Sequence, residues 1–121
     1  MLTVIQSLKG DRAFQRLRRG KAGHAKLLSL RWRPAREDGV RVGVVVNKKV
    51  GKAVVRNRVR RRLREALRAI LLRAEMQRKE VRRKDVFALE VVIIARPEAA
   101  DADYWQLKGA LEHALRKGQV L

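Results

Sequence analysis

Residues 40–68 read VRVGVVVNKKVGKAVVRNRVRRRLREALR, and within this stretch the spacing of the apolar residues changes. Valine occupies every second position from Val40 to Val46, a pattern typical of a strand with one buried face. From Ala53 onward the apolar residues recur every three or four positions, which is typical of an amphipathic helix. The stretch therefore predicts a strand over 40–47, a turn around Gly51 and a helix over 53–73. Gly43 has no side chain, so another part of the backbone could approach the strand closely there.

The predicted helix has an apolar stripe and a basic outer face. The stripe comprises Val55, Val59, Leu63, Ala66, Leu67 and Ile70. At about 100° per residue, the opposite face carries Asn57, Arg61, Arg64 and Arg68, and one flank carries Arg58, Arg62 and Glu65. Arg56 falls inside the apolar arc, where an unpaired guanidinium would be costly to bury. Arg56 therefore either lies in the first helical turn or, as we favour, extends along the sheet surface toward a partner.

The N-terminal third predicts a short helix followed by a strand. The helix covers residues 11–19, with Asp11 as its cap. Leu28, Leu30 and Trp32 alternate with polar residues, which predicts a strand over 27–32. A further short strand is possible over 21–25, and residues 34–39 form a turn.

The C-terminal third predicts a central strand and a last helix. Residues 86–95 are apolar on both faces apart from Glu90, which indicates a strand covered on both sides. The last helix begins at Asp101 or Asp103 and ends at Gly118. The charged segment 75–85 lies between the predicted helix over 53–73 and the predicted strand over 86–95. It either extends that helix or forms a loop.

These elements predict a single α+β domain over residues 1–121. Three helices pack on a mixed sheet of about four strands, in the order αβββαβα, as a two-layer sandwich. The strands over 40–47 and 86–95 are joined by a helix, so we expect them to run parallel.

Composition points to an anionic partner. The 121 residues include 31 Lys and Arg against 12 Asp and Glu, a net charge of +19, and nucleic acid is the leading candidate. Cysteine is absent, which excludes disulfides and thiolate metal sites. We find no apolar run long enough to cross a membrane and no signal-peptide pattern, so we expect a cytoplasmic protein.

The positive charge is concentrated between Asn47 and Arg68. Ten basic residues and one acidic residue, Glu65, lie in this segment. The ten are Lys48, Lys49, Lys52, Arg56, Arg58, Arg60, Arg61, Arg62, Arg64 and Arg68. An ordinary solvated helix face is the alternative, but Arg60, Arg61 and Arg62 adjoin one another, and such crowding is unfavourable unless a polyanion binds.

The run from Asn47 to Arg61 closely resembles the signature of the bacterial ribonuclease P protein family. The RNR motif of that family matches Arg56, Asn57 and Arg58. The opening helix around Phe14, the strand 40–46, the run Ile93–Pro97 and the final helix 107–115 also resemble it, so the similarity covers nearly the whole chain. Asn47 departs from the serine that is frequent in the family, and the aromatic residues frequent after Phe14 are missing here.

The resemblance implies a function that composition does not. Proteins of this family are subunits of a ribonucleoprotein endonuclease that removes the 5′ leader from precursor tRNA. The catalytic centre belongs to the RNA subunit, which uses Mg²⁺, so no catalytic or metal-binding residue is expected in the protein. The expected partners are one RNA subunit per protein and precursor tRNA, with no membrane. The family fold also implies a left-handed crossover through the RNR helix, against the usual preference.

Two RNA-binding surfaces follow from the residues and the resemblance together. The RNA subunit is expected to contact Asn57 and the ten basic residues between Asn47 and Arg68. We expect Arg56 and Arg58 to bind the RNA subunit without contributing to the stability of the fold. The leader is expected in a cleft formed by Arg12, Phe14, Arg16, Trp32, Arg41, Val45 and Asn47. Phe14 and Trp32 are candidate platforms for stacking bases, with core packing as the alternative for each. Phe87, Tyr104 and Trp105 are interpreted as packing residues.

Three other functions are less favoured by the residues. Catalysis by the protein itself would need a motif joining His24 and His113, and none is present. A non-catalytic RNA-binding module, such as a ribosomal protein or an RNA chaperone, shares the charge and the fold class but not the RNR signature. A DNA-compacting protein would need a dimerisation arm or a recognition-helix pattern, and we find neither.

Overall fold

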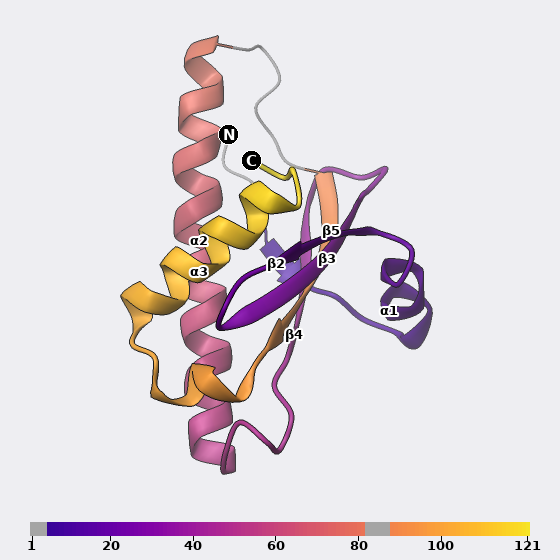
Figure 1. Ribbon diagram of the computed structural model, residues 1–121. Coiled ribbons are helices and arrows are strands. Elements are labelled where there is room, and N and C mark those ends of the chain that lie inside the picture. Colours follow the sequence, from indigo (N-terminus) through magenta and orange to yellow (C-terminus); the bar gives the residue numbers. More distant parts are fainter. Residues whose placement is uncertain (1–4, 82–87) are drawn as a thin grey trace.

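A computed structural model describes residues 5–81 and 88–121, and its centre is a five-stranded mixed sheet (Figure 1). The strand order is β1-β4-β5-β3-β2. The strands are β1 (Ile5–Ser7), β2 (Lys21–His24), β3 (Leu28–Pro34), β4 (Gly39–Val45) and β5 (Ala88–Ala95). The α+β class is therefore confirmed, with five strands in place of about four. The possible strand over 21–25 is present as β2, whereas β1 was not predicted because three residues are too few to show a period.

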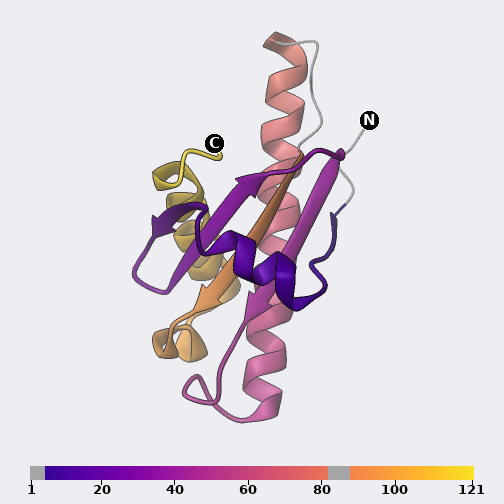
Figure 2. The same ribbon diagram turned by 90° about the vertical axis from the view of Figure 1, so that its right-hand side faces the viewer.

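Helices cover both faces of the sheet. The elements are α1 (Asp11–Leu17), α2 (Ala53–Val81), the 3₁₀ helix η1 (Pro97–Asp101) and α3 (Tyr104–Lys117). Figure 1 shows α2 and α3 on one side of the sheet and α1 on the other, and in Figure 2 α1 lies in front of the sheet with α2 and α3 behind it. The expected two-layer sandwich is thus extended by α1, which forms a partial third layer.

The middle strand, β5, joins the two halves of the sheet. It pairs parallel with β4, as predicted, and antiparallel with β3. Its Val91 and Ile93 are fully buried under α2 and α3, while Val92 is buried on the other face by residues of the α1 region. The prediction of a central strand is confirmed for residues 88–95, and residues 86 and 87 lie outside the described part. The left-handed crossover through α2 stays a prediction from the resemblance.

The apolar stripe of α2 forms much of the core. Val59, Leu63, Ala66 and Leu67 are inaccessible to solvent, and Ile70 is 5% exposed, as the helical projection predicts. The helix continues well beyond residue 73, so the first part of the charged segment 75–85 is helical to Val81. Residues 82–87, including Phe87, lie outside the described part of the chain.

The helix ends show one wrong and two correct sequence predictions. Asp11 is the first residue of α1 and not its cap, because Gly10 occupies that position with a φ of 90° and makes no side-chain hydrogen bond. Asp103 caps α3: its carboxylate accepts from the Gln106 N–H, and the Gln106 side chain accepts from the Asp103 N–H. Gly118 ends α3, as predicted.

Candidate nucleic-acid interface

The outer face of α2 is an exposed row of basic side chains. Asn57, Arg61, Arg64 and Arg68 all point away from the core, as the projection predicts. Arg61 has one weak ionic contact, with Glu65 at 4.0 Å, and 65% of its side chain is exposed. Exposed guanidinium groups can make bidentate contacts with phosphates, so this face suits a polyanion.

One flank of α2 is tied to the segment that leads into α3. Arg58 Nη2 donates to the Ala100 carbonyl at 3.2 Å, and Arg62 Nη1 donates to the Ala102 carbonyl at 3.0 Å. Arg58 Nε is buried and has no hydrogen-bond partner among the described residues. These two arginines therefore connect α2 to η1. This contact does not agree with the expectation that Arg58 contributes nothing to the fold, whereas its binding of RNA stays a prediction.

The other flank of α2 is tied to the end of β4 and the turn after it. Arg60 donates to the Val46 carbonyl at 3.4 Å and to Asn57 Oδ1 at 3.0 Å. Arg56 lies in the first helical turn, and its Nε donates back to the Gly51 carbonyl at 3.1 Å. Of the two positions considered for Arg56, the structure has the first, so the preferred one along the sheet surface is wrong.

The turn between β4 and α2 presents three exposed lysines. Lys48, Lys49 and Lys52 are all solvent-exposed. The turn is held by the exposed Asn47, whose Oδ1 accepts from the Lys49 N–H at 3.0 Å and whose carbonyl accepts from the Val50 N–H at 3.1 Å. Asn47 therefore shapes the turn that carries the lysines from the sheet edge to the start of α2.

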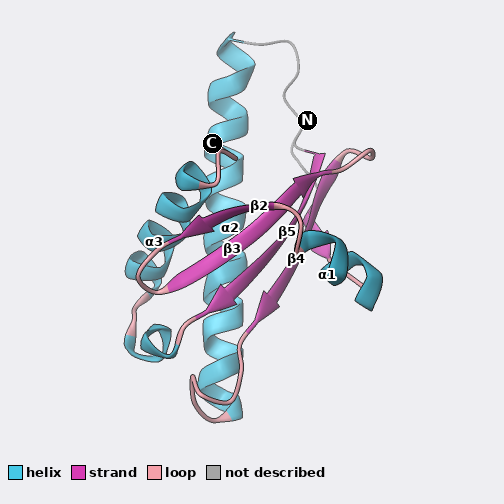
Figure 3. Cartoon of the chain, turned by 45° about the vertical axis from the view of Figure 1, so that its right-hand side comes forward, coloured by secondary structure: helices cyan, strands magenta, loops and turns pink. Residues whose placement is uncertain are grey.

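The face of the sheet opposite α2 is divided by α1, which crosses in front of the strands in Figure 2 and lies on the side of the sheet away from α2 in Figure 3. In the middle of this face Phe14 lies on Gly43, where an added Cβ would be 2.7 Å from the Phe14 Cζ. Beside Gly43, Val92 packs with Leu8 and Leu17. The missing side chain at Gly43 thus makes room for the Phe14 ring, whereas we expected another backbone segment to approach there.

On one side of α1 the sheet face is apolar and open. The register places Val45 of β4 beside Ile94 of β5, and these side chains are 39% and 37% exposed. Val45 lies two residues from Gly43 and two from Asn47, so this surface runs from the Phe14 contact to the lysine turn. We call Phe14, Val45, Ile94 and Asn47 the open sheet surface.

On the other side of α1 the sheet face is charged. Glu90 accepts from Arg16 at 3.3 Å and lies 3.8 Å from Arg33, and the register places Arg41 next to it. Arg16, Arg41 and Glu90 line an open depression of about 630 Å³ with Lys9 and Gln6. Arg41 also pairs with Glu37 at 2.9 Å.

Arg16 and Arg41 are therefore separated by α1 from the open sheet surface, although we expected one cleft. Arg12, also expected there, is exposed on α1.

The structure buries one tryptophan and exposes the other, so Trp32 takes the core-packing alternative and Trp105 does not take the packing role expected of it. Trp32 is only 9% exposed, faces α3, and donates through Nε1 to the Gly118 carbonyl at 2.6 Å. It therefore cannot stack on bases at the open sheet surface. Trp105, interpreted as a packing residue, is 71% exposed. Helical periodicity gives no sign of this, because position 105 adjoins the apolar stripe of α3.

The described residues offer neither a metal cluster nor a membrane segment. Among the side chains that the structure describes, those of residues 5–74 and 88–121, no three His, Cys, Asp or Glu come together in a way that could hold a metal ion. No helix in this part of the chain is both long enough and apolar enough to cross a membrane.

Known proteins resemble this chain in sequence and in fold. The family description "Ribonuclease P" matches residues 2–119. The chain is 50% identical over 117 residues to the ribonuclease P protein component of Thermus thermophilus and 48% identical to that of Thermus brockianus. Each alignment covers 97% of this chain but 62% of the relative, so the chain spans less than two thirds of these proteins.

Solved structures agree with the sequence relatives. The RNase P protein of Staphylococcus aureus matches with a TM-score of 0.72 and 27% identity, over 91% of this chain and 92% of that chain. The RNase P protein of Thermotoga maritima matches with a TM-score of 0.66 and 26% identity, over 88% of this chain and 91% of that chain. Because the family match extends from residue 2 to residue 119 and the same fold recurs in these structures, the chain belongs to the ribonuclease P protein family.

Proposed function

We propose that this chain is the protein subunit of a ribonuclease P, an endoribonuclease whose catalytic centre is its RNA subunit. One protein and one RNA subunit together remove the 5′ leader of precursor tRNA in the cytoplasm, and residues 1–121 act as a single RNA-binding domain. The observation that supports this most strongly is the arrangement of two exposed surfaces about one turn. The basic outer face of α2 and the open sheet surface meet at Asn47, Lys48 and Lys49.

The outer face of α2 is the part proposed to bind the RNA subunit. Arg61, Arg64 and Arg68 are free to approach phosphates, because their side chains are exposed and point away from the core. Lys48, Lys49 and Lys52 extend the same positive surface around the N-terminal end of the helix. Contacts with phosphates fix the position and orientation of an RNA without reading its sequence.

The open sheet surface is the part proposed to bind the leader. A single strand needs exposed aromatic or apolar surface for its bases and positive charge for its backbone. Phe14, Val45 and Ile94 supply the first, and the adjacent lysine turn supplies the second. The protein would hold the leader while the scissile bond lies against the RNA subunit.

Chemistry at the scissile bond is assigned to the RNA subunit. Mg²⁺ held by that RNA would supply the metal-ion chemistry of hydrolysis. The protein's part is to lower the repulsion between the RNA subunit and precursor tRNA, both of which are polyanions, by placing positive charge between them. Less Mg²⁺ would then be needed to bring the two RNAs together.

Cleavage of precursor tRNA at low Mg²⁺ tests the proposal. The chain is added to a bacterial ribonuclease P RNA, such as that of Thermus thermophilus, at a Mg²⁺ concentration where the RNA alone is slow. We expect faster cleavage at the mature 5′ end. RNA binding without any increase in rate would instead favour a non-catalytic RNA-binding module.

A pair of variants in the same assay separates the two surfaces. Phe14→Leu is expected to weaken the holoenzyme's preference for precursor over mature tRNA, because mature tRNA has no leader to contact the open sheet surface. Arg64→Ala is expected to weaken assembly with the RNA subunit and to leave that preference unchanged. Equal effects of both variants on both quantities would contradict the assignment of two surfaces.

A further inference from the structure

Trp105 is an aromatic side chain that the core leaves exposed. It is the second residue of α3, and 71% of it is open to solvent, whereas Leu107 and Leu111 of the same helix are fully buried. Exposing an indole to water forfeits the stabilisation that its burial would contribute. An exposed aromatic side chain of this size is a common feature of binding sites.

Neighbouring side chains hold the indole and place a positive charge against it. The Tyr104 ring meets it edge to face, with centroids 5.1 Å apart and planes at 80°. Lys108 Nζ lies 5.4 Å from the centroid of the Trp105 ring, a cation–π distance. The position of the ring is thus defined by contacts on α3 itself, and a cation accompanies the aromatic surface.

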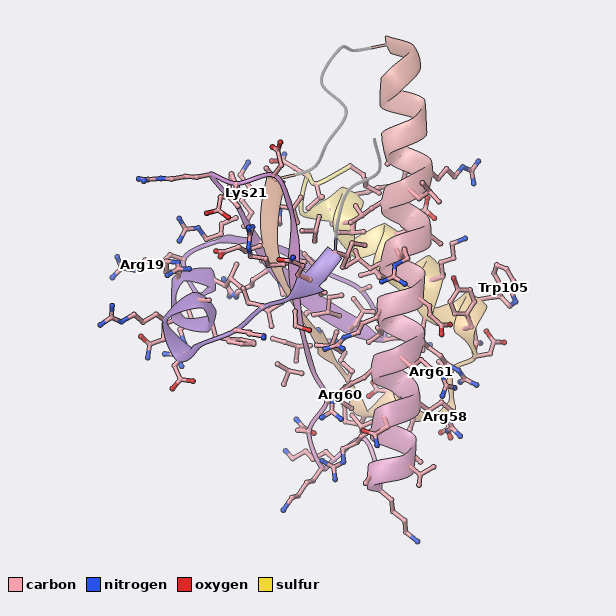
Figure 4. The ribbon with its side chains drawn as sticks, turned by 180° about the vertical axis from the view of Figure 1, so that it is seen from behind. Arg19, Lys21, Arg58, Arg60, Arg61 and Trp105 are labelled. Carbon is pink, nitrogen blue, oxygen red and sulfur yellow. The ribbon has the colours of Figure 1, made fainter. Side chains whose placement is uncertain are left out.

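This site adjoins the arginines of α2. Arg58 and Arg62 donate to the carbonyls of Ala100 and Ala102, which immediately precede α3. Figure 4 shows Arg58 and Arg61 on the same side of α2 as Trp105, whereas Arg60 lies on the other side. The exposed ring therefore continues the basic surface of α2 onto α3.

We propose that Trp105 stacks on an unpaired nucleobase of the RNA that binds α2, while Lys108 contacts a phosphate of the same strand. This inference rests on the proposed function, because it takes the occupant to be the RNA subunit. Charge complementarity favours RNA: Lys108 lies against the ring, Arg58 and Arg61 lie on the same side of the neighbouring helix α2, and a nucleotide offers both a flat base and a negative charge. A purely apolar partner would not use the positive charge of Lys108 beside the ring.

A graded series at position 105 tests the stacking. The affinity of each variant for a bacterial ribonuclease P RNA is measured at fixed salt. Trp105→Phe keeps an aromatic ring and should bind nearly as the wild type, whereas Trp105→Ala should bind roughly 5- to 100-fold more weakly. Trp105→Leu keeps apolar area without a ring and should resemble Trp105→Ala. Equal affinities for Leu and Phe would overturn stacking as the interaction.

Fluorescence provides a readout that does not depend on a variant. The chain has two tryptophans, and because Trp32 is buried, acrylamide quenching of the free protein reports mainly on Trp105. RNA binding should reduce the acrylamide quenching of wild-type protein. As a control for the variant series, the thermal unfolding midpoint of Trp105→Ala should equal that of the wild type.

The outcomes distinguish this inference from the function on which it rests. Wild-type affinity of Trp105→Ala, with quenching unchanged on RNA binding, would overturn the inference and leave the proposed function standing. Failure of the wild-type protein to bind the RNA at all would overturn both. A dimer of the free protein that Trp105→Ala dissociates would assign the surface to a second copy and would also overturn the inference.

Discussion

At the scale of single residues, the arginines of α2 differ in what their side chains contact. Arg61 and Arg64 are exposed, and their donors are available to a ligand. Arg58 and Arg62 donate to backbone carbonyls of the segment before α3. A charged donor to a partly buried carbonyl stabilises the fold by more than a neutral hydrogen bond does, and removing the donor leaves the carbonyl unsatisfied. Arginines of one helix thus differ in whether their donors contact the fold or are open to a ligand.

The first prediction compares Arg58→Ala with Arg61→Ala. Arg58→Ala should lower the free energy of unfolding by about 1.5–3 kcal/mol, because it removes the bond to Ala100. Arg61→Ala should change it by less than about 0.5 kcal/mol, because the side chain is exposed. Urea unfolding measures both values, and RNA binding should weaken in Arg61→Ala. Equal stability of the two proteins would show that the Arg58 bond contributes nothing to the fold.

At the scale of elements, two close contacts position helices against the sheet. An added Cβ on Gly23 of β2 would overlap the Ala114 carbonyl oxygen of α3, so the strand and the helix meet backbone to backbone. On the opposite face, Gly43 admits the Phe14 ring of α1. The first contact fixes the position of α3, and with it Trp105. The second fixes the ring at one end of the open sheet surface.

The second prediction compares two glycine-to-alanine substitutions that should change the stability of the protein in opposite directions. Gly23→Ala should destabilise the protein by about 1–3 kcal/mol, because α3 must move away from β2. Gly109→Ala lies on the exposed side of α3, with nothing within 4 Å of the added Cβ, and should stabilise by about 0.5–1 kcal/mol. Thermal melting of the two variants beside the wild type is the measurement. A stable Gly23→Ala would mean that β2 and α3 are not closely packed.

At the scale of the whole molecule, the net charge of +19 is distributed over separate surfaces. The outer face of α2 and the lysine turn form one, and the cluster of Arg16, Arg33 and Arg41 around Glu90 lies across α1 from the open sheet surface. The like charges repel one another in the free protein, and a bound polyanion removes that repulsion.

The third prediction concerns salt. If about 6–10 phosphates are neutralised on binding the RNA subunit, the affinity should fall by about 10³–10⁵ between about 50 and 200 mM monovalent salt. For the Arg64→Ala variant, the slope of log affinity against log salt concentration should be smaller by about the amount that one phosphate contact contributes. Filter binding at several salt concentrations gives both slopes. An affinity independent of salt would rule out an interface dominated by phosphates.

Much of the fold could be predicted from local patterns. The alternating valines predicted β4, the three-to-four spacing predicted the buried stripe of α2, and the apolar run predicted β5 as a central strand. Each pattern records which side of an element meets the core, and that information is local in sequence. The length of α2 was left open between a helix extension and a loop, and the strand β1 was not predicted, because charged and very short segments carry no apolar period.

The candidate site was predicted less completely, because exposure depends on what packs against each face. By itself the sequence determined the α+β class, the parallel pair β4 and β5, the concentration of basic residues on α2 and the resemblance to a family. Only the tertiary structure decided that Trp32 is buried and Trp105 exposed, that Arg58 binds a carbonyl of η1, and that α1 separates Arg41 from Val45. The physical reason is that periodicity reports the side of an element on which a residue lies, whereas burial and hydrogen bonding depend on contacts between elements distant in the chain.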